Sequence, residues 1–252
     1  IWGEDCSEIV PVSVLRAAPR LGGVVAGAFD EESMLQGMVF GLTGIDSDGR
    51  PLHWSDMLAV RPALQNRGLG ERLKRWQRDA VLPLGVRHVL WTFDPLEAKN
   101  AYLNVSRLGV VATEYIRDYY GDTASPLHSG APTDRLVADW RVASDRVRRR
   151  LARETRPPTA SEVVSLPAAL DARVESGVPR PAAGEPTGNA SPVRIAVPSE
   201  IQALKVAEPR LVAEWRAATR LAFEACFGRG LRIEEVVRAG DVAHYVLGVD
   251  AD

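Results

Sequence analysis

The stretch from Leu58 to Lys74 constrains the fold more than any other part of this 252-residue chain. It reads LAVRPALQNRGLGERLK: an apolar strand ends at Val60, a proline turn and a Gln-x-x-Gly-x-Gly loop follow, and a helix begins. The helix is expected because apolar side chains recur near the helical period, at Leu69, Leu73, Trp76 and Ala80. This order of elements brings the unpaired N–H groups of the first helical turn to the end of the strand.

The loop is suited to an anion such as a phosphate or a pyrophosphate, because the positive end of the helix dipole adds to the N–H groups. Gly68 and Gly70 lack the Cβ atoms that would keep an anion away, and Arg67 can add a charge-assisted hydrogen bond. No Walker Gly-Lys-Ser/Thr follows, and Leu73 stands where a Rossmann fingerprint needs its third glycine. The alternative is that the glycines only shape a strand-to-helix turn.

Together with two later stretches, the loop resembles the acyl-CoA pyrophosphate loop of the GNAT superfamily of N-acyltransferases. The resemblance rests on LAVRP at 58–62 and QNRGLG at 65–70, on HVLWTFDP at 88–95 as the fifth strand of that fold, and on NAYLNVSRLGV at 100–110 as its fourth helix. WTFDPL, the Asn-Ala-x-x-Asn run and DRLVADW at 134–140 resemble more narrowly a bacterial branch described as predicted GNAT acetyltransferases. The superfamily resemblance covers about residues 20–142.

Hydrophobic periodicity predicts an α+β fold. Helices are expected over 9–20, 69–82 and 97–108, and strands over 24–29, 34–43, 52–60, 86–93, 110–117 and 135–142. The strand–helix–strand run ending at 93 predicts a right-handed crossover between parallel strands. The resemblance implies a mixed, mostly antiparallel central sheet in which this parallel pair splays apart, with helices on both faces.

Three segments are expected along the chain. Residues 1–143 form the GNAT-like acyl-CoA-binding domain, and 144–192 an Arg-rich helix followed by a Pro/Ala/Gly-rich linker. The arginines of 144–156 favour a solvated helix over a nucleic-acid contact, since no aromatic residues are interleaved. Residues 193–252 read as a β-α-β-β unit too small to bury a core alone, so it packs on the first domain or on a partner subunit.

The resemblance implies transfer of an acetyl group from acetyl-CoA to a small-molecule amine or amino acid, by direct attack in a ternary complex. The alternatives are another acyl-CoA such as succinyl-CoA, or a non-catalytic acyl-CoA-binding module. Asn100 and Asn104, four residues apart on a helix, are expected to hydrogen-bond the CoA arm or else to lie at the surface. The other expected CoA-binding residues are Leu58, Ala59, Val60, Gln65, Asn66, Arg67, Gly68, Leu69, Gly70 and Glu71.

The general base has three candidates. Asp56 shares one face of its strand with Leu58 and Val60, as a group facing a ligand cleft would. His53 at the start of the same strand and Glu114 on a later strand are the others. A strand-end carboxylate that faces only solvent is the alternative for Asp56.

The general acid departs from the family pattern. Val105 stands where many GNAT members place a tyrosine four residues before the Leu-Gly glycine. Tyr102 lies one turn earlier and is expected to pack rather than to donate a proton. Water, Asn104 or Tyr115 is then expected to assist the departing thiolate.

Charged residues near two strand ends are candidates for substrate binding. Asp94 follows the end of a parallel strand, where open α/β sheets bind ligands. Asp134 and Arg135 offer a carboxylate and a guanidinium that suit an amino-acid-like substrate. A structural ion pair is the equal alternative for Asp134 and Arg135.

Composition limits the partners. The net charge of −2 gives no reason to expect nucleic acid or a membrane, and no apolar run has the length of a membrane span. Two isolated cysteines, Cys6 and Cys226, and no visible signal peptide predict a cytoplasmic protein. The four histidines form no metal-ligand pattern, so no metal is expected. The expected partners are acyl-CoA and a small amine, with a homodimer as a further possibility.

Overall fold

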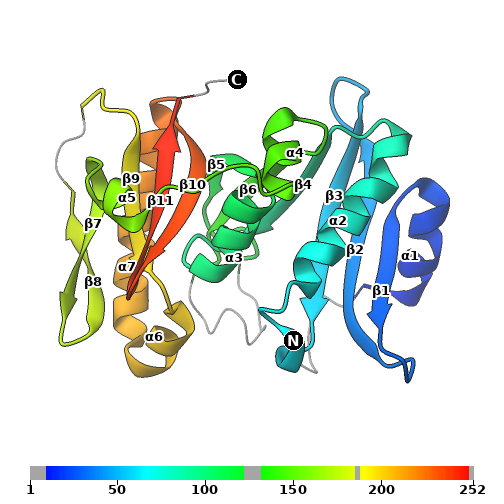
Figure 1. The fold of residues 1–252 in the computed structure, drawn as a ribbon, viewed down its shortest axis with the longest axis horizontal. Helices are drawn as coiled ribbons and strands as arrows, with labels where there is room; N and C mark the ends of the chain where they lie inside the picture. The colour runs from blue at the N-terminus through cyan, green and yellow to red at the C-terminus, as the bar shows by residue number, and fades with distance from the viewer. Residues whose placement is uncertain (1–9, 122–131, 185–187, 250–252) are drawn as a thin grey trace. The chain divides into compact units, whose positions relative to one another are not determined.

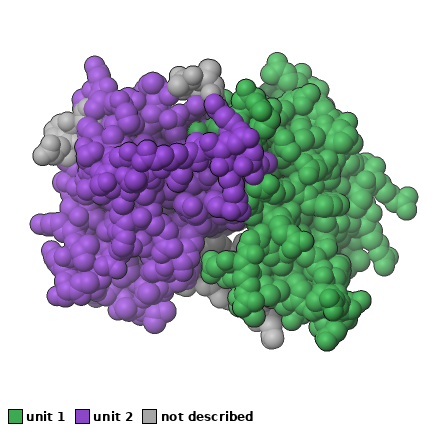
Figure 2. Space-filling model, viewed as in Figure 1, with its two compact units in different colours: residues 1–91, 125–127, 139–148 green, residues 92–124, 128–138, 149–252 purple. Residues whose placement is uncertain are grey.

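The structure, a computed structural model, describes residues 10–121, 132–184 and 188–249. Cys6 and His128 lie outside these residues. The chain divides into two compact units (Figure 2): residues 1–91, 125–127 and 139–148 form unit 1, and residues 92–124, 128–138 and 149–252 form unit 2.

Unit 1 is built on an antiparallel meander followed by a crossover helix (Figure 1). Strand order is β1-β2-β3-β4-β6, and the last two strands also extend into unit 2. The strands are β1 (Val24–Phe29), β2 (Leu35–Ile45), β3 (Pro51–Val60), β4 (His88–Phe93) and β6 (Arg135–Arg141). The helices are α1 (Val12–Ala17), η1 (Ala18–Leu21), η2 (Pro62–Leu64), α2 (Leu69–Val81), η3 (Leu82–Leu84) and the start of α4 (Asp145–Leu151).

The two parallel strands of unit 1 separate after a short pairing. β3 pairs with β4 only at Leu52↔His88, His53↔Val89 and Trp54↔Leu90, although β3 continues to Val60. On its other edge β3 stays paired with β2, whose register shifts between Phe40↔Met57 and Leu42↔Trp54. Ser55 and Asp56 therefore oppose Gly41 as a β-bulge at the point where the parallel pairing ends. The expected parallel, splayed strand pair is confirmed.

Unit 2 has strand order β6-β5-β10-β11-β9-β7-β8. Its further strands are β5 (Val111–Ile116), β7 (Ala168–Glu175), β8 (Val178–Ala183), β9 (Val193–Pro198), β10 (Arg232–Ala239) and β11 (Val242–Gly248). Its helices are α3 (Ala98–Tyr102), the π-helical turn η4 (Leu103–Arg107), α5 (Ala160–Val164), α6 (Ile201–Ala207) and α7 (Pro209–Gly228). β7 runs parallel to β9, and the pairs β10–β11 and β11–β9 are antiparallel.

Helices cover both faces of the unit 2 sheet. Neighbouring residues of β11 point to opposite faces: the ring of Tyr245 meets Phe223 of α7, whereas Val246 packs with Val163 of α5. Both faces are apolar and buried along β9 and β11, which explains why these strands read as nearly continuous apolar runs. The mixed, mostly antiparallel α+β fold with helices on both faces is confirmed.

The prediction that the Pro/Ala/Gly-rich segment is a linker is wrong for most of its length. Residues 168–183 form the β7–β8 hairpin, which turns at Ser176 and Gly177, both with positive φ angles of 51° and 79°. β8 carries Pro179 and Pro181 and lies at the end of the strand order, where proline costs no ladder hydrogen bond. A Pro- and Ala-rich edge strand has neither the alternation nor the β-branched content that identifies a strand in a sequence.

The C-terminal β-α-β-β unit is part of a larger structure rather than a separate module. β10 pairs with β5 at Ile233↔Ala112, so the C-terminal strands join the sheet of their own chain. The Arg-rich segment begins with α4, and Arg150, which is partly buried, binds the buried Glu235 of β10 at 2.6 Å. This segment is therefore anchored within unit 2 and is not a purely solvated helix.

Candidate functional site

The glycine-rich loop of unit 1 presents a row of unpaired backbone donors. No described residue accepts a hydrogen bond from the amide N–H groups of Asn66, Arg67, Gly68, Leu69 or Gly70. The first helical bond across the loop is that from the Arg72 amide to the Gly68 carbonyl, at 3.0 Å. These amides lie at the start of the 13-residue helix α2, where the dipole favours an anion.

Backbone conformation explains the glycine at position 68 and the turn before it. Gly68 is the N-cap of α2 with φ +84°, and Asn66 also adopts a left-handed conformation with φ +61°. An ideal Cβ on Gly68 would meet no atom within 4 Å, so the space over this residue is open. Alternating left-handed residues aim successive N–H groups into one concavity, which is the geometry of an anion nest.

Two side chains fix the loop to the strands that precede it. Arg61 donates from Nε to the Leu35 carbonyl at 2.6 Å, and its backbone N–H donates to the Gln36 carbonyl at 3.0 Å. Gln65 donates from Nε2 to the Val60 carbonyl at 3.2 Å. Gln65 thus has a structural role in the loop, while exposed Arg67 has no ion-pair partner among the described residues and remains available to an anion.

A hollow of about 460 Å³ opens on the β1 side of α2. It is lined by the β1 residues from Val25 to Ala28 and by Leu69, Arg72, Leu73 and Trp76. The half-exposed indole of Trp76 therefore borders a cavity rather than the core, which the helical period of the sequence does not reveal.

A buried chain of hydrogen bonds links α2 to β3 and β2. Lys74 Nζ donates to Ser55 Oγ at 2.6 Å, and Ser55 Oγ donates to Gln77 Oε1 at 2.9 Å. Gln77 Nε2 lies 3.0 Å from His53 Nε2, and His53 Nδ1 lies 2.8 Å from Thr43 Oγ1. Thr43 donates its only hydroxyl proton, from Oγ1, to the Gly22 carbonyl at 2.6 Å.

This last bond sets the direction of the whole chain. Because Thr43 donates to a carbonyl, its oxygen must accept from His53 Nδ1, which leaves His53 Nε2 as an acceptor for the Gln77 amide. Burial, with the nearby Lys74 charge, lowers the pKa of His53 to about 4, so the imidazole is neutral near pH 7. Both ring nitrogens are engaged, and His53 is not a free general base.

Asp56 is the base candidate that the structure leaves free. It is exposed at the bulge of β3, and no described residue bonds its carboxylate. Ser55, the residue before it, is buried and bonds Lys74 and Gln77 of α2. Asp56 itself is exposed, and Leu58 and Val60, which the sequence predicts on its face of the strand, are partly buried.

The other catalytic candidates lie in unit 2. Glu114 is exposed on β5. Tyr115 donates its hydroxyl proton to Asp134 at 2.7 Å, and burial together with this bond raises the pKa of the phenol. The Tyr115 proton is therefore held by a carboxylate and is not available to a thiolate.

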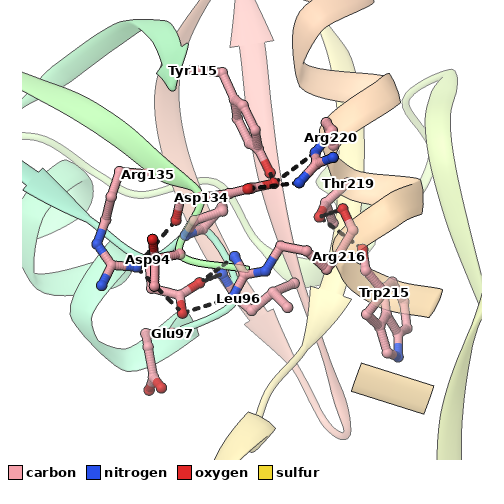
Figure 3. A network of polar contacts seen from close by, with 12 residues as sticks. Asp94, Leu96, Glu97, Tyr115, Asp134, Arg135, Trp215, Arg216, Thr219 and Arg220 are labelled. Atoms are coloured by element: carbon pink, nitrogen blue, oxygen red, sulfur yellow. Dashed lines mark hydrogen bonds and ion pairs between the residues drawn. The ribbon is translucent and has the colours of Figure 1, made fainter. Parts of the chain in front are cut away.

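The three residues expected to bind substrate belong to an ion-pair network with α7 (Figure 3). Asp94 accepts two hydrogen bonds from Arg216, at 2.7 and 2.8 Å, and one from the Leu96 amide. Asp134 accepts two from Arg220, at 2.8 and 2.7 Å, besides that from Tyr115.

Arg135 donates from Nη1 to the backbone carbonyl of its neighbour Asp134 at 3.1 Å. Its guanidinium lies 3.7 Å from Asp94 and 5.0 Å from the centre of the Tyr120 ring. Burial alone would raise the pKa of Asp94, but Arg216, Arg135 and the Leu96 amide hold it below its ordinary value. The carboxylates expected to recognise a substrate thus anchor α7, as the structural alternative for Asp134 anticipated in part.

The π-helical turn separates the two asparagines expected to hold the CoA arm. Asn100 is exposed on α3, whereas Asn104 in η4 is 2 % exposed, and its Nδ2 has no hydrogen-bond acceptor among the described residues. The wider turn of η4 moves position 104 off the face that a regular helix would give it. Val105 is fully buried, and Tyr102 is 37 % exposed rather than packed in the core.

Sequence reasoning did not single out Lys74, which the structure buries on α2. The signal was present, since a lysine at 74 follows Leu73 on the face of α2 that is otherwise buried. The stretch that identified the loop ended at this residue, and a lysine near the end of such a pattern reads as solvent-exposed.

The described part of the chain contains neither a cluster of metal ligands nor a helix that could cross a membrane. Among residues 10–121, 132–184 and 188–249, no three His, Cys, Asp or Glu side chains gather as metal ligands would. Within the same residues, none of the helices combines the length and the hydropathy that a bilayer crossing requires.

No protein-family model and no curated protein matches the chain. Among solved structures it is similar to Naa20 of Chaetomium thermophilum in complex with a bisubstrate analogue, with TM-score 0.44, 18 % identity, and coverage of 57 % of this chain and 74 % of that one. A GNAT family acetyltransferase from Elizabethkingia anophelis with acetyl-CoA bound gives TM-score 0.38 and 13 % identity, with coverage of 54 % of this chain and 92 % of that one. The NatC complex bound to Gag peptide and CoA gives TM-score 0.43 and 14 % identity, with coverage of 54 % of this chain and 83 % of that one.

Proposed function

We propose that the protein is an N-acyltransferase that transfers an acetyl group from acetyl-CoA to a small-molecule amine or amino acid. The observation that carries this proposal is the arrangement in unit 1, where the five successive amides of Asn66 to Gly70 have no acceptor among the described residues and lie a short turn beyond β3, whose described pairs with β4 end at Trp54. A pyrophosphate needs such a row of donors, and a pantetheine arm with two amide groups needs such an edge.

The cofactor would lie along β3 and end at the loop. Its pyrophosphate accepts hydrogen bonds from the amides at the start of α2, and Arg67 adds a charge at the rim. Its amides pair with the backbone of Leu58, Ala59 and Val60, which lies beyond the last residue paired with β4. The bound cofactor thus continues the sheet where the protein strands have separated.

The reaction is a direct attack that needs both reactants bound at once. The free amine nitrogen attacks the thioester carbonyl carbon, the C–S bond breaks, and the CoA thiolate leaves. The nitrogen loses its extra proton to water as the amide forms. Asp56 is our candidate for the base that takes the ammonium proton, directly or through water, because its carboxylate is exposed and unpaired among the described residues. Water is our candidate for the proton donor to the thiolate, since the Tyr115 proton is bonded to Asp134.

A second function is favoured by one observation. Val105 is fully buried at the position where the resemblance expects a tyrosine, so the family's usual proton donor is absent. A non-catalytic acyl-CoA-binding module would show the same loop and the same free strand edge. Binding and turnover must therefore be measured separately.

Calorimetric titration of the full chain with CoA and acetyl-CoA tests the binding proposal. A panel of amines and amino acids with acetyl-CoA and with succinyl-CoA, assayed by thiol release, then tests turnover and the acyl group. Asp56→Asn should reduce turnover and leave CoA affinity unchanged. CoA binding without thiol release for any amine would favour the binding module, and absence of CoA binding would refute both functions.

A further inference from the structure

Lys74 occupies an unusual position for a lysine. Its side chain is 3 % exposed, and no carboxylate among the described residues pairs with it. The ammonium nitrogen has two neighbours instead: Ser55 Oγ at 2.6 Å and the face of the Trp91 ring, 3.6 Å from its centre. A buried charge without a counter-ion is costly, so its retention requires a physical reason.

The two neighbours of Lys74 belong to the two strands that separate. The last backbone pair of the parallel strands is Trp54↔Leu90, and Ser55 and Trp91 are the next residue on each strand. Lys74 therefore bridges β3 and β4 at the first position where they no longer bond each other. We call the place defined by Ser55, Lys74 and Trp91 the fork.

The surroundings of the fork are built to hold Lys74 in place. Ser55 can accept from Lys74 because its own proton goes to Gln77, and the chain through His53 to Thr43 fixes the orientation of that amide. Gly41 makes room for this chain, since a Cβ there would come within 2.3 Å of His53 Nε2 and 2.9 Å of Gln77 Nε2. Trp91 is held by an edge-on contact with Trp140, at 6.0 Å between ring centres.

Among the described residues, no other charge near the fork neutralises Lys74. The elements packed on α2 contribute few ionisable groups: β1, β2 and η3 contain none, β3 contributes neutral His53 and exposed Asp56, and β4 contributes His88, which bonds Asp139. On α2 itself, Glu71 pairs with Arg75, Arg78 pairs with Asp79, and Arg72 is exposed. Asp139 also bonds Arg141, the remaining charge of β6 in unit 1.

We propose that Lys74 is a positioning residue of the acyl-CoA site: it holds the fork in the separated form that the cofactor requires, and it binds a proton when the anionic cofactor occupies the loop. The inference rests on the function proposed above, because it assigns Lys74 to the same site. An anion bound at the first turn of α2 lies on the helix that carries Lys74 and supplies the negative charge that the protein does not.

Proton uptake follows from the free and bound states of the amine. Burial lowers the pKa of Lys74 to about 7, so in the free protein the amine is mostly neutral above that pH. The phosphate charges of the cofactor favour the ammonium form and raise the pKa. If the rise is one unit, binding at about pH 8 takes up about 0.4 proton per cofactor, and binding at about pH 6 takes up less than about 0.1.

The test is calorimetric titration of the full chain with CoA in two buffers that differ in ionisation enthalpy, at about pH 8 and at about pH 6. Wild-type protein is compared with Lys74→Arg, which keeps a permanent charge, and with Lys74→Met, which keeps the length of the side chain without a charge. The phosphate groups of CoA titrate equally in all three proteins, so the difference between them isolates Lys74.

We expect buffer-dependent heat at the higher pH for the wild type and its loss in both variants. Affinity should fall about tenfold or more in Lys74→Met, the scale of one desolvated cation–π contact, and stay within a few-fold of wild type in Lys74→Arg. A merely structural lysine would lower affinity or stability without any proton uptake.

Each other outcome counts against the proposal. Wild-type uptake no larger than that of the variants overturns it, as does unchanged affinity in Lys74→Met. Circular dichroism and thermal unfolding check the fold, and if Lys74→Met does not fold, the comparison with Lys74→Arg decides. Binding without proton uptake refutes the role of Lys74 alone, whereas absence of any CoA binding refutes the proposed function as well.

Discussion

Removing Arg216 is expected to destabilise unit 2 by leaving the Asp94 carboxylate buried without its main partner. The Arg216 and Asp94 side chains are only 5 % and 12 % exposed, and two short hydrogen bonds join them. After Arg216→Met, the described partners that Asp94 keeps are the Leu96 amide at 2.9 Å and the Arg135 guanidinium at 3.7 Å. Breaking a buried pair by removing one partner costs about 3–5 kcal/mol of unfolding free energy. Because the contact with Arg135 remains, we expect a loss of about 3 kcal/mol, at the lower end of this range.

The measurement is urea unfolding followed by circular dichroism, with equal slopes required for wild type and variant. The double variant Asp94→Asn/Arg216→Met should lose less than Arg216→Met alone, because it no longer buries an uncompensated charge. Arg117→Met is the matched control, since Arg117 makes the same two-bond contact with Glu224 of α7 but is 59 % exposed. Its effect should be much smaller because solvent screens an exposed pair.

Two results would refute this reasoning. If Arg216→Met costs less than about 1 kcal/mol, the carboxylate has found water or another donor, and it is not a buried charge in the sense used here. If the loss of unfolding free energy in the double variant equals the sum of the losses in Asp94→Asn and Arg216→Met, the two side chains act independently. The ion pair between them would then not account for the stability.

Three further predictions concern unit 1 and the family pattern. Gly68→Leu should weaken CoA binding at least tenfold in calorimetry, because it forces a side chain into φ +84° and into the open space over the loop; unchanged affinity would remove the phosphate cradle. Tyr102→Phe should keep most activity with any substrate found, because Tyr102 lies one helical turn before the position where the resemblance places a tyrosine. A loss of kcat by orders of magnitude in a folded protein would show that Tyr102 is the proton donor after all. The free energy of unfolding should rise by about 2–3 kcal/mol between about pH 6 and pH 9, because the unfolded state binds more protons than a folded Lys74 whose pKa is about 7 against an ordinary 10.5. Urea titrations of Lys74→Met should show a flatter pH profile.

The elements around the loop could be predicted because their signals are local. The apolar alternation of β1 to β4, the proline after β3 and the helical period of α2 each identify an element within a dozen residues. β7 and β8 escaped prediction because Pro and Ala in an edge strand carry no such signal. The π-helical turn η4 escaped for a related reason, since its apolar residues follow an ordinary helical pattern, while the structure buries the polar Asn104 and Ser106 within it.

The roles of Asp94, Asp134 and Tyr115 depend on hydrogen bonds to residues far away in the sequence, which no local pattern reveals. Asp94 and Arg216 are separated by 122 residues, and Asp134 and Arg220 by 86. A carboxylate after a parallel strand reads equally well as a ligand site and as an anchor until its partner is known. The hydroxyl of Tyr115 is similar, because only the position of Asp134 shows that its proton is engaged.

The segment from Trp91 to Leu96 shows why a motif match alone misassigns function within this fold. Its first residue, Trp91, faces Lys74 at the fork of unit 1, whereas Asp94 bonds α7 and the Pro95 carbonyl accepts from Tyr245 in unit 2. One short run thus carries the end of the proposed cofactor site and the start of the anchoring of the C-terminal half. Because the two tasks fall on different side chains, a Trp91 variant and an Asp94 variant separate them: cofactor affinity depends on the first, and the stability of unit 2 on the second.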